Sequence, residues 1–302
     1  MLFFIRSLYI FFLLFYFTIF CIPEQSQKIN LVSNDKNCKK RNSEIDYSRM
    51  SCIPAGEFIM GYNGYTIEED TGRKIKDTFP EHKVYLDSYW IDKYEVTYKE
   101  YQECVKAKYC PPAGPNYKGY SNPMQPMLGV NWYQAKTYCK WKKKRLPTEA
   151  EWEKAARGEN GEIYPWGNGP ATCEKAIIKE KGKRGCGKGT TWDVGSRPAY
   201  RYGLYDIAGN SWEWVEDWYA ENYEKCGIDC FQRNPKGPCN GNLECPGHNK
   251  KIVRGGSWWW EGEFATGYNR RAHFPENKPF HHFGFRCASR WLDYVLLFSL
   301  YL

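Results

Sequence analysis

The pattern of hydrophobic and polar positions predicts strands at the start of a folded domain, which we place at residues 49–290. Residues 52–61 (CIPAGEFIMG) alternate enough to form a first strand. Residues 84–97 (VYLDSYWIDKYEVT) predict one or two strands that lead into a helix. The domain therefore begins with β structure and continues with helices.

Three helices are indicated by capping boxes, in which a Thr or Asn precedes a Glu or Gln by three positions. The pairs are Thr97 with Glu100, Asn131 with Gln134, and Thr148 with Glu151. The third helix should end at Gly158, with Trp152, Ala155 and Ala156 on one face. Beyond Gly158 the periodicity is weak, and Gly, Pro, Trp and Cys dominate. We expect irregular structure with a few short strands there.

The N-terminus predicts export. One Arg precedes an apolar run of 14 residues at 7–20, which is shorter than the roughly 20 residues of a membrane span. We expect residues 1–20 to be a signal peptide resembling that of a bacterial lipoprotein, with lipidation at Cys21. Phe20 departs from the usual small residue, so an uncleaved membrane anchor stays open.

Two further segments flank the predicted domain. Residues 21–48 are polar and aperiodic, which is typical of a tether. The apolar tail at 291–302 is too short to span a bilayer. Packing of this tail onto the domain and a disordered tail are the two alternatives. The predicted location is the bacterial cell envelope, either lipid-anchored to the membrane or periplasmic.

Composition adds aromatic packing and disulfides to this picture. Aromatic residues make up 18% of the chain, yet the mean hydropathy is −0.71, so Trp, Tyr and Phe supply the apolar surface. The chain has 13 cysteines, and 12 remain without Cys21, an even number suited to full pairing after export. Two matched CxxC pairs are missing, which argues against a zinc site.

The net charge of the chain adds little to the prediction of its function. The net charge of +8 lies partly in two lysine-rich runs, at residues 140–145 and 179–188. No nucleic-acid-binding motif accompanies them, so we interpret them as solvated surface and expect no nucleic-acid partner.

Eight segments, taken in order, closely resemble one protein family. They are IPAGEFIMG, YEVTYKEYQECV, PMLGVNWYQAKTYCKW, KRLPTEAEWEKAARG, YPWGN, GLYDIAGNSWEWVEDWY, VRGGSW and FGFRCAS. The chain resembles the formylglycine-generating enzyme (sulfatase-modifying factor) family over about residues 52–290. This resemblance implies a single α+β domain, related to the C-type lectin fold, with much irregular structure.

Active members of that family oxidise a sulfatase cysteine to formylglycine, using oxygen and a copper ion held by two cysteine thiolates. The resemblance places those cysteines at the third and eighth positions after the Ser of GGS, where this chain has Trp260 and Ala265. Neither side chain binds Cu(I), which prefers thiolates. We therefore expect no copper and no oxidase activity, and we assign no catalytic residue.

Part of the family pocket is retained. The resemblance assigns Ser257 and Trp212 to its lining, and Arg270 and Arg271 to a strand facing the substrate cleft. Trp258 and Trp260 are further pocket candidates. The alternative is structural, because the run Trp258, Trp259 and Trp260 could fill the space left by the metal site. Neighbouring strand residues point to opposite faces, so we expect Trp258 or Trp259 to pack in the core.

A structural calcium site is a further expectation. Asp206 and Glu213 are hard oxygen ligands seven residues apart, and Gly209 allows a sharp turn between them. The resemblance assigns calcium to Asp206, Glu213 and the backbone carbonyls of Gly209 and Ser211. It also implies the disulfide Cys139–Cys287. Proximity in sequence favours two more pairs, Cys104 with Cys110 and Cys173 with Cys186, and leaves Cys226, Cys230, Cys239 and Cys245 open between three connectivities.

Three functions fit these observations. The first is a non-catalytic envelope protein that binds a peptide or other ligand, which we favour. The second is a family enzyme with oxidoreductase-type activity on a protein or small molecule. The third is a structural protein without a pocket, which predicts that Trp258, Trp259 and Trp260 are all buried.

Overall fold

The structure, a computed structural model, describes residues 38–40, 42–115, 117–276 and 281–290. The chain divides into two units, Met1–Ser33 and Asn34–Leu302, and every described residue belongs to the second. The predicted signal peptide, the lipidation site Cys21, most of the tether and the apolar tail lie outside the described residues. Within the described part, no helix is both long and apolar enough to cross a membrane.

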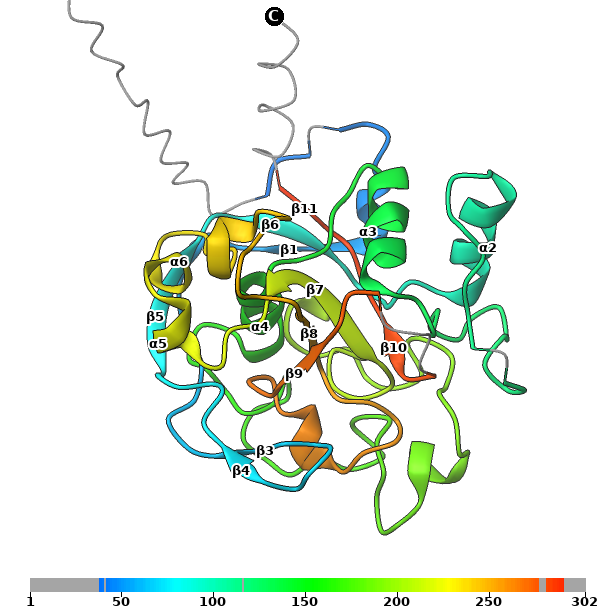
Figure 1. Cartoon of the computed structure of the whole chain (residues 1–302). Helices are drawn as coiled ribbons and strands as arrows, with labels where there is room; N and C mark the ends of the chain where they lie inside the picture. Colours follow the sequence, from blue (N-terminus) through cyan, green and yellow to red (C-terminus); the bar gives the residue numbers. More distant parts are fainter. Residues whose placement is uncertain (1–37, 41, 116, 277–280, 291–302) are drawn as a thin grey trace, which may run out of the picture. The chain divides into compact units, whose positions relative to one another are not determined.

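A four-stranded sheet positions the candidate site. Its order is β10 (Phe283–Gly284), β7 (Trp212–Trp218), β8 (Lys251–Arg254) and β9 (Arg270–His273). The pair β10–β7 is parallel, and the other pairs are antiparallel. Figure 1 shows these strands side by side in the middle of the ribbon. The GGS turn directly follows β8, so this sheet fixes where that turn lies.

The remaining strands come mainly from the first hundred residues. A three-stranded antiparallel sheet has the order β1 (Met50–Ile53), β6 (Tyr89–Asp92) and β11 (Ala288–Ser289). Strand β2 (Gly56–Met60) pairs with β5 (His82–Leu86), and β3 (Thr66–Ile67) pairs with β4 (Lys74–Ile75). The single strand expected at residues 52–61 is thus two strands, interrupted at Pro54, which has no N–H for a ladder.

The three predicted helices are confirmed. They are α2 (Tyr98–Lys106), α3 (Trp132–Trp141) and α4 (Glu149–Arg157), and each begins with its complete capping box. Gly158 ends α4 with φ 69°, a conformation that glycine adopts without strain. Two short helices, α5 (Tyr223–Cys226) and α6 (Ile228–Phe231), occur in the region expected to be irregular.

Helix α4 is buried on every side, which its sequence pattern does not reveal. Trp152, Ala155 and Ala156 pack in the hydrophobic core, as their shared face predicts. The opposite, charged face is buried too, because arginines cover it. Each of its three carboxylates contacts two guanidinium groups: Glu149 contacts Arg254 and Arg270, Glu151 contacts Arg145 and Arg290, and Glu153 contacts Arg157 and Arg254.

All twelve described cysteines are disulfide-bonded. The bridges include the three expected pairs, Cys139–Cys287, Cys104–Cys110 and Cys173–Cys186. The four cysteines whose pairing the sequence left open form Cys226–Cys230 and Cys239–Cys245. Cys38 pairs with Cys52. Cys139–Cys287 joins α3 to the segment before β11 across 148 residues, so it ties the early and late halves of the domain.

Candidate functional site

The turn after β8 is built by two glycines. Gly255 has φ 97° and Gly256 has φ 72°, a region of backbone conformation that favours glycine. A Cβ on Gly256 would lie 2.8 Å from Ala265 Cα and from Phe264 O. The turn therefore packs directly against the segment that carries Ala265. Any larger residue at position 256 would push the two segments apart.

The three consecutive tryptophans have different environments. Trp258 is 1% exposed, and its Nε1 donates a hydrogen bond to His281 O at 3.2 Å. Trp259 is half-buried, and the Arg184 guanidinium lies 3.3 Å from its ring centroid. Trp260 is half-buried against Phe264, with ring centroids 5.5 Å apart. One tryptophan of the run is therefore in the core, and the other two reach the surface.

Trp260 and Ala265, which stand where the family has its copper-binding cysteines, both pack against apolar side chains. Ala265 is 1% exposed and lies in a cluster with Ala176, Ile178 and Ala208. Trp260 Nε1 is buried and has no hydrogen-bond partner among the described residues. Since every described cysteine is in a disulfide, this part of the chain offers no thiolate for Cu(I). The donor set present here does not fit copper.

Ser257 and Trp212, the predicted pocket residues from the family frame, are both buried. Ser257 is 1% exposed, and its Oγ accepts a hydrogen bond from Trp259 N at 3.4 Å. Trp212 is fully buried at the start of β7, and its Nε1 donates to Glu69 Oε1 at 3.2 Å. Glu69 belongs to the β3–β4 turn, and no sequence pattern singled it out.

The two neighbouring arginines of β9 have opposite surroundings. Arg270 is fully paired inside the protein, with its Nε 2.6 Å from Glu149 Oε1 and its Nη1 2.5 Å from Asp77 O. Arg271 instead faces the β3–β4 turn, where it pairs with Glu69 and, at 3.0 Å, with Asp70. Of the two predicted pocket arginines, Arg271 is the one placed to meet a ligand.

A small charged pocket of about 130 Å³ lies between β9 and the β3–β4 turn. We call it the β9 pocket. Its lining includes Glu69, Asp70, Asp77, Trp212, Arg270 and Arg271. Ser257, Trp258 and Trp260 do not line it. The predicted pocket residues therefore separate into two groups, one at β9 and one at the GGS turn.

A larger cavity of about 500 Å³ also borders β3. We call it the aromatic cleft. It is lined by Tyr65, Thr66, Ile67, Ile163, Tyr164, Asn168, Pro170, Glu263, Phe264, Thr266, Tyr268 and Asn269. Phe264, which packs on Trp260, forms part of its wall. Figure 1 shows the β3–β4 hairpin beside the orange turn that contains these late residues. Sequence reasoning missed this cleft, because its walls come from segments about a hundred residues apart.

The predicted calcium turn is buried and bonded. Asp206 Oδ2 accepts a hydrogen bond from Gly195 N at 2.6 Å. Both carboxylate oxygens of Glu213 accept a hydrogen bond from Arg286 at 2.7 Å. Glu213 Oε2 also accepts one from Trp152 Nε1 at 2.8 Å. Glu95, which sequence reasoning missed, accepts hydrogen bonds from Asn210 Nδ2 at 2.6 Å and Ser211 Oγ at 2.5 Å.

This turn carries more buried acid than base. Burial raises the pKa of Asp206 to about 6. Burial, and then the neighbouring Asp206 and Glu213, raise the pKa of Glu95 well above its usual value. Such an excess of carboxylate fits a hard cation, whose ligands are carboxylate and carbonyl oxygens. Among the described residues, no group of three His, Cys, Asp or Glu side chains is placed to hold a metal, so calcium here would depend on backbone carbonyls as well.

Comparisons with known proteins agree with this architecture. Residues 35–291 match the sulfatase-modifying factor enzyme 1-like domain. The formylglycine-generating enzyme of Bos taurus is 30% identical over 302 residues, covering 80% of this chain and 75% of that protein. The inactive C-alpha-formylglycine-generating enzyme 2 of Mus musculus is 31% identical over 205 residues, covering 63% of this chain and 57% of that protein. Variable protein 1 of Treponema denticola has a similar structure, with a TM-score of 0.61, 26% identity, and coverage of 80% of this chain and 94% of that one.

The fold and these similarities define a single domain of the formylglycine-generating-enzyme type, and the predicted α+β class is confirmed. The chain belongs to the sulfatase-modifying factor family.

Proposed function

We propose that this chain is a family member without copper-dependent oxidase activity, and that it acts as an exported envelope protein by binding a peptide or other ligand. The observation that carries the loss of activity is the pair Trp260 and Ala265. Ala265 is sealed in an alanine- and isoleucine-lined cluster, and Trp260 packs on Phe264. Two thiolates would be needed in their place. The name of the mouse relative, an inactive enzyme, is in keeping with this proposal.

The aromatic cleft supports the binding role. At about 500 Å³ it is in the size range of ligand pockets, and Tyr65, Tyr164, Tyr268 and Phe264 give its walls aromatic surface. Among the described residues that line it, Glu263 is the one carboxylate or cationic side chain. Such a lining suits an extended peptide with uncharged side chains, whose backbone the Asn and Thr groups would hydrogen-bond. Trp260 packs on Phe264, which forms part of the cleft wall, and so supports that wall from behind.

The oxidase proposal is tested with a sulfatase-type cysteine peptide, copper and oxygen, using mass spectrometry to detect formylglycine. We expect none, while an active family enzyme in the same buffer converts the peptide. The matched variant carries Trp260→Cys and Ala265→Cys, and we expect it to bind Cu(I) where the wild type does not. Formylglycine produced by the wild-type chain would disprove the proposal.

The binding proposal is tested by fluorescence anisotropy with the same peptide carrying Ser in place of the target cysteine. Tyr164→Ala and Tyr268→Ala should each weaken binding about tenfold, the effect of losing an aromatic contact of 1–2 kcal/mol. The control is Tyr109→Ala, an exposed tyrosine outside the cleft. Equal losses for Tyr109→Ala and the cleft variants would contradict a cleft-specific site.

We further propose that the turn at residues 206–213 binds calcium through Asp206, Glu213 and the carbonyls of Gly209 and Ser211. The excess of buried carboxylate at this turn supports it. Calcium here would stabilise the loop and take no part in chemistry.

A further inference from the structure

Of the three carboxylates that the β3–β4 hairpin brings to the β9 pocket, Glu69 is the deeply buried one. Glu69 lies in the turn after β3, yet its side chain is only 4% exposed. Its Oε1 accepts the Trp212 indole hydrogen bond at 3.2 Å, and its carboxylate pairs with Arg271. Carboxylates of turns are normally solvated, so this one is held inside by the groups that it meets.

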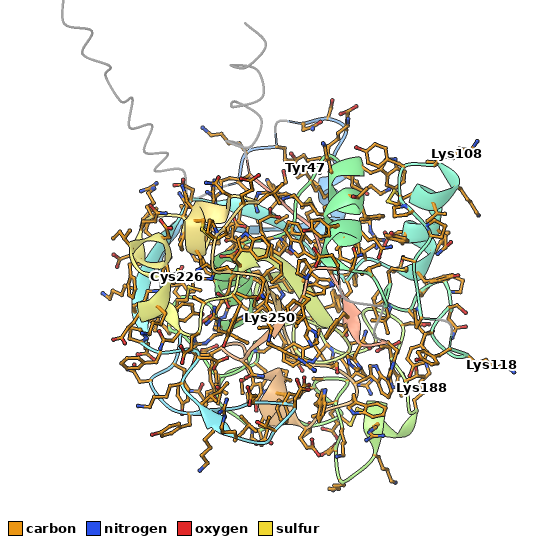
Figure 2. All side chains as sticks on the ribbon, viewed as in Figure 1. Tyr47, Lys108, Lys118, Lys188, Cys226 and Lys250 are labelled. Carbon is orange, nitrogen blue, oxygen red and sulfur yellow. A yellow bond between two sulfur atoms is a disulfide. The ribbon has the colours of Figure 1, made fainter. Side chains whose placement is uncertain are left out.

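Arg271 and Trp212, which bind the Glu69 carboxylate, together form a carboxylate receptor. The Arg271 side chain is 12% exposed, and its planar guanidinium can bind both oxygens of one carboxylate. Burial lowers the pKa of Arg271 to about 10, which means that burial disfavours its charged form. A carboxylate bound to Arg271 would offset that cost. Lys250, labelled near the middle of Figure 2, adds a further cationic side chain to the lining beside Arg270 and Arg271.

The other acids of the β9 pocket have their own partners. Glu68 pairs with Arg73 at 3.4 Å, and Asp77 accepts the Thr66 hydroxyl at 2.5 Å. Asp70 contacts Arg271 from outside, with its side chain 73% exposed. Glu69 is therefore the acid that occupies the receptor among the described residues that line the pocket.

We propose that the β9 pocket is a carboxylate-binding site that Glu69 occupies in the absence of ligand, and that a ligand carboxylate replaces Glu69 on Arg271 and Trp212. The ligand class is a peptide bearing a free carboxylate, at its C-terminus or on an acidic side chain. This extends the proposed peptide-binding function, because Ile67 and Asn269 line both the β9 pocket and the aromatic cleft. A peptide in the cleft thus reaches Arg271 when the hairpin turn moves.

The hairpin is suited to such a movement. Its strands are two residues each and are joined through two residue pairs, Thr66 with Ile75 and Ile67 with Lys74. A two-stranded hairpin of this length has little stability of its own. Its turn can therefore leave the pocket without disturbing the four-stranded sheet.

Chemical rescue tests the receptor itself. In the full chain, Glu69→Ala should lower the thermal midpoint, and sodium acetate should raise it again relative to sodium chloride at equal ionic strength. Wild type should respond equally to the two salts, and so should the double variant Glu69→Ala with Arg271→Ala. Asp70→Ala is the matched control, since its carboxylate is exposed. Glu69→Gln, which retains the shape and the Trp212 acceptor, serves if the alanine variant does not fold. An acetate response no larger than the chloride response in both Glu69 variants would overturn the proposal.

Peptide binding tests the ligand class in the wild-type chain. The Ser-substituted sulfatase-type peptide is compared as its C-terminal acid, its C-terminal amide, and the amide with one internal Glu. We expect an acid form to bind about tenfold more tightly than the plain amide, and Arg271→Ala to remove that difference. The better acid form identifies the source of the carboxylate. Equal binding of all three refutes the carboxylate site and leaves the cleft function standing. Absence of binding by all three refutes the cleft function, and the acetate experiment then decides this site alone.

Discussion

The carboxylates of α4 and those around the turn at residues 206–213 are similarly buried but differently paired. Each carboxylate of α4 contacts two arginines. Around the turn, Glu95, Asp206 and Glu213 have one ion-pair partner among the described residues, Arg286 on Glu213. The same residue types thus form a balanced network in one place and an acidic excess in the other.

The pKa values follow this balance. Burial by itself raises the pKa of Glu153, but Arg254 and Arg157 outweigh it and hold that pKa below its usual value. Burial raises the pKa of Asp206, and the backbone N–H of Gly195 and Arg286 offset only part of this. The network of α4 is complete and needs no further ion, whereas the turn keeps an excess of acid, which is the basis of the calcium proposal.

The strongest test of the comparison is Glu153→Ala in α4. It leaves Arg157 and Arg254 buried with one fewer anion, and removing one partner of a buried ion pair typically costs about 3–5 kcal/mol. Urea unfolding followed by circular dichroism measures the loss. Glu153→Gln is the matched control, because it keeps the side-chain shape and one acceptor. A loss below about 1 kcal/mol for the alanine variant would show that the network contributes little to stability.

The same network predicts destabilisation by acid. Glu151 and Glu153 have pKa values below that of an ordinary glutamate, because the arginines outweigh burial. Their contribution to stability is present above the unfolded pKa of about 4.3 and is lost as pH falls below it. The free energy of unfolding should therefore decrease from pH 5 to pH 3. Glu153→Gln should show a smaller decrease, and curves of equal slope would contradict this assignment.

Calcium should stabilise the turn and leave α4 unaffected. At a concentration 100 times its dissociation constant, calcium would add about 2.7 kcal/mol to the free energy of unfolding. Asp206→Asn should remove most of this gain at pH 7, while Glu153→Gln retains it. The measurement is urea unfolding with calcium, with magnesium and with chelator. A gain that is the same in wild type and Asp206→Asn would place the ion elsewhere.

The smallest effect is expected at an exposed ion pair. Lys83 and Glu57 lie 3.8 Å apart on β5 and β2, with side chains 75% and 64% exposed. Water and salt screen such a pair, so Glu57→Ala should change the free energy of unfolding by less than about 0.5 kcal/mol. The same urea titration checks it. A larger loss would mean that ion-pair number, and not burial, separates α4 from the rest of the protein.

Local signals in the sequence were sufficient for the helices. The three capping boxes each use residues three positions apart, so α2, α3 and α4 follow from short-range hydrogen bonds. The disulfides between neighbouring cysteines, Cys104–Cys110 and Cys173–Cys186, are short-range in the same sense. The order of the family segments fixed the fold class and placed Trp260 and Ala265.

The candidate site depends on contacts that sequence patterns do not encode. Arg270 and Arg271 are adjacent and chemically identical, yet one pairs with Glu149 in the interior and the other faces Glu69. Alternation along β9 predicts opposite faces but not what each face meets. Likewise, Glu69 in the hairpin turn has no periodic signal, and only the packing of the hairpin against β9 brings it to Trp212.

The sequence alone therefore determined the three main helices, the family frame and the replacement of both copper ligands, because these depend on residue identity and short spacings. The tertiary structure decided that α4 is buried on all sides and that Trp258 is in the core while Trp259 and Trp260 reach the surface. It also decided that the aromatic cleft and the β9 pocket share Ile67 of β3 in their linings. These features depend on which distant segments pack together. Burial then decides whether a charge is neutralised by the fold or left available to bind a partner.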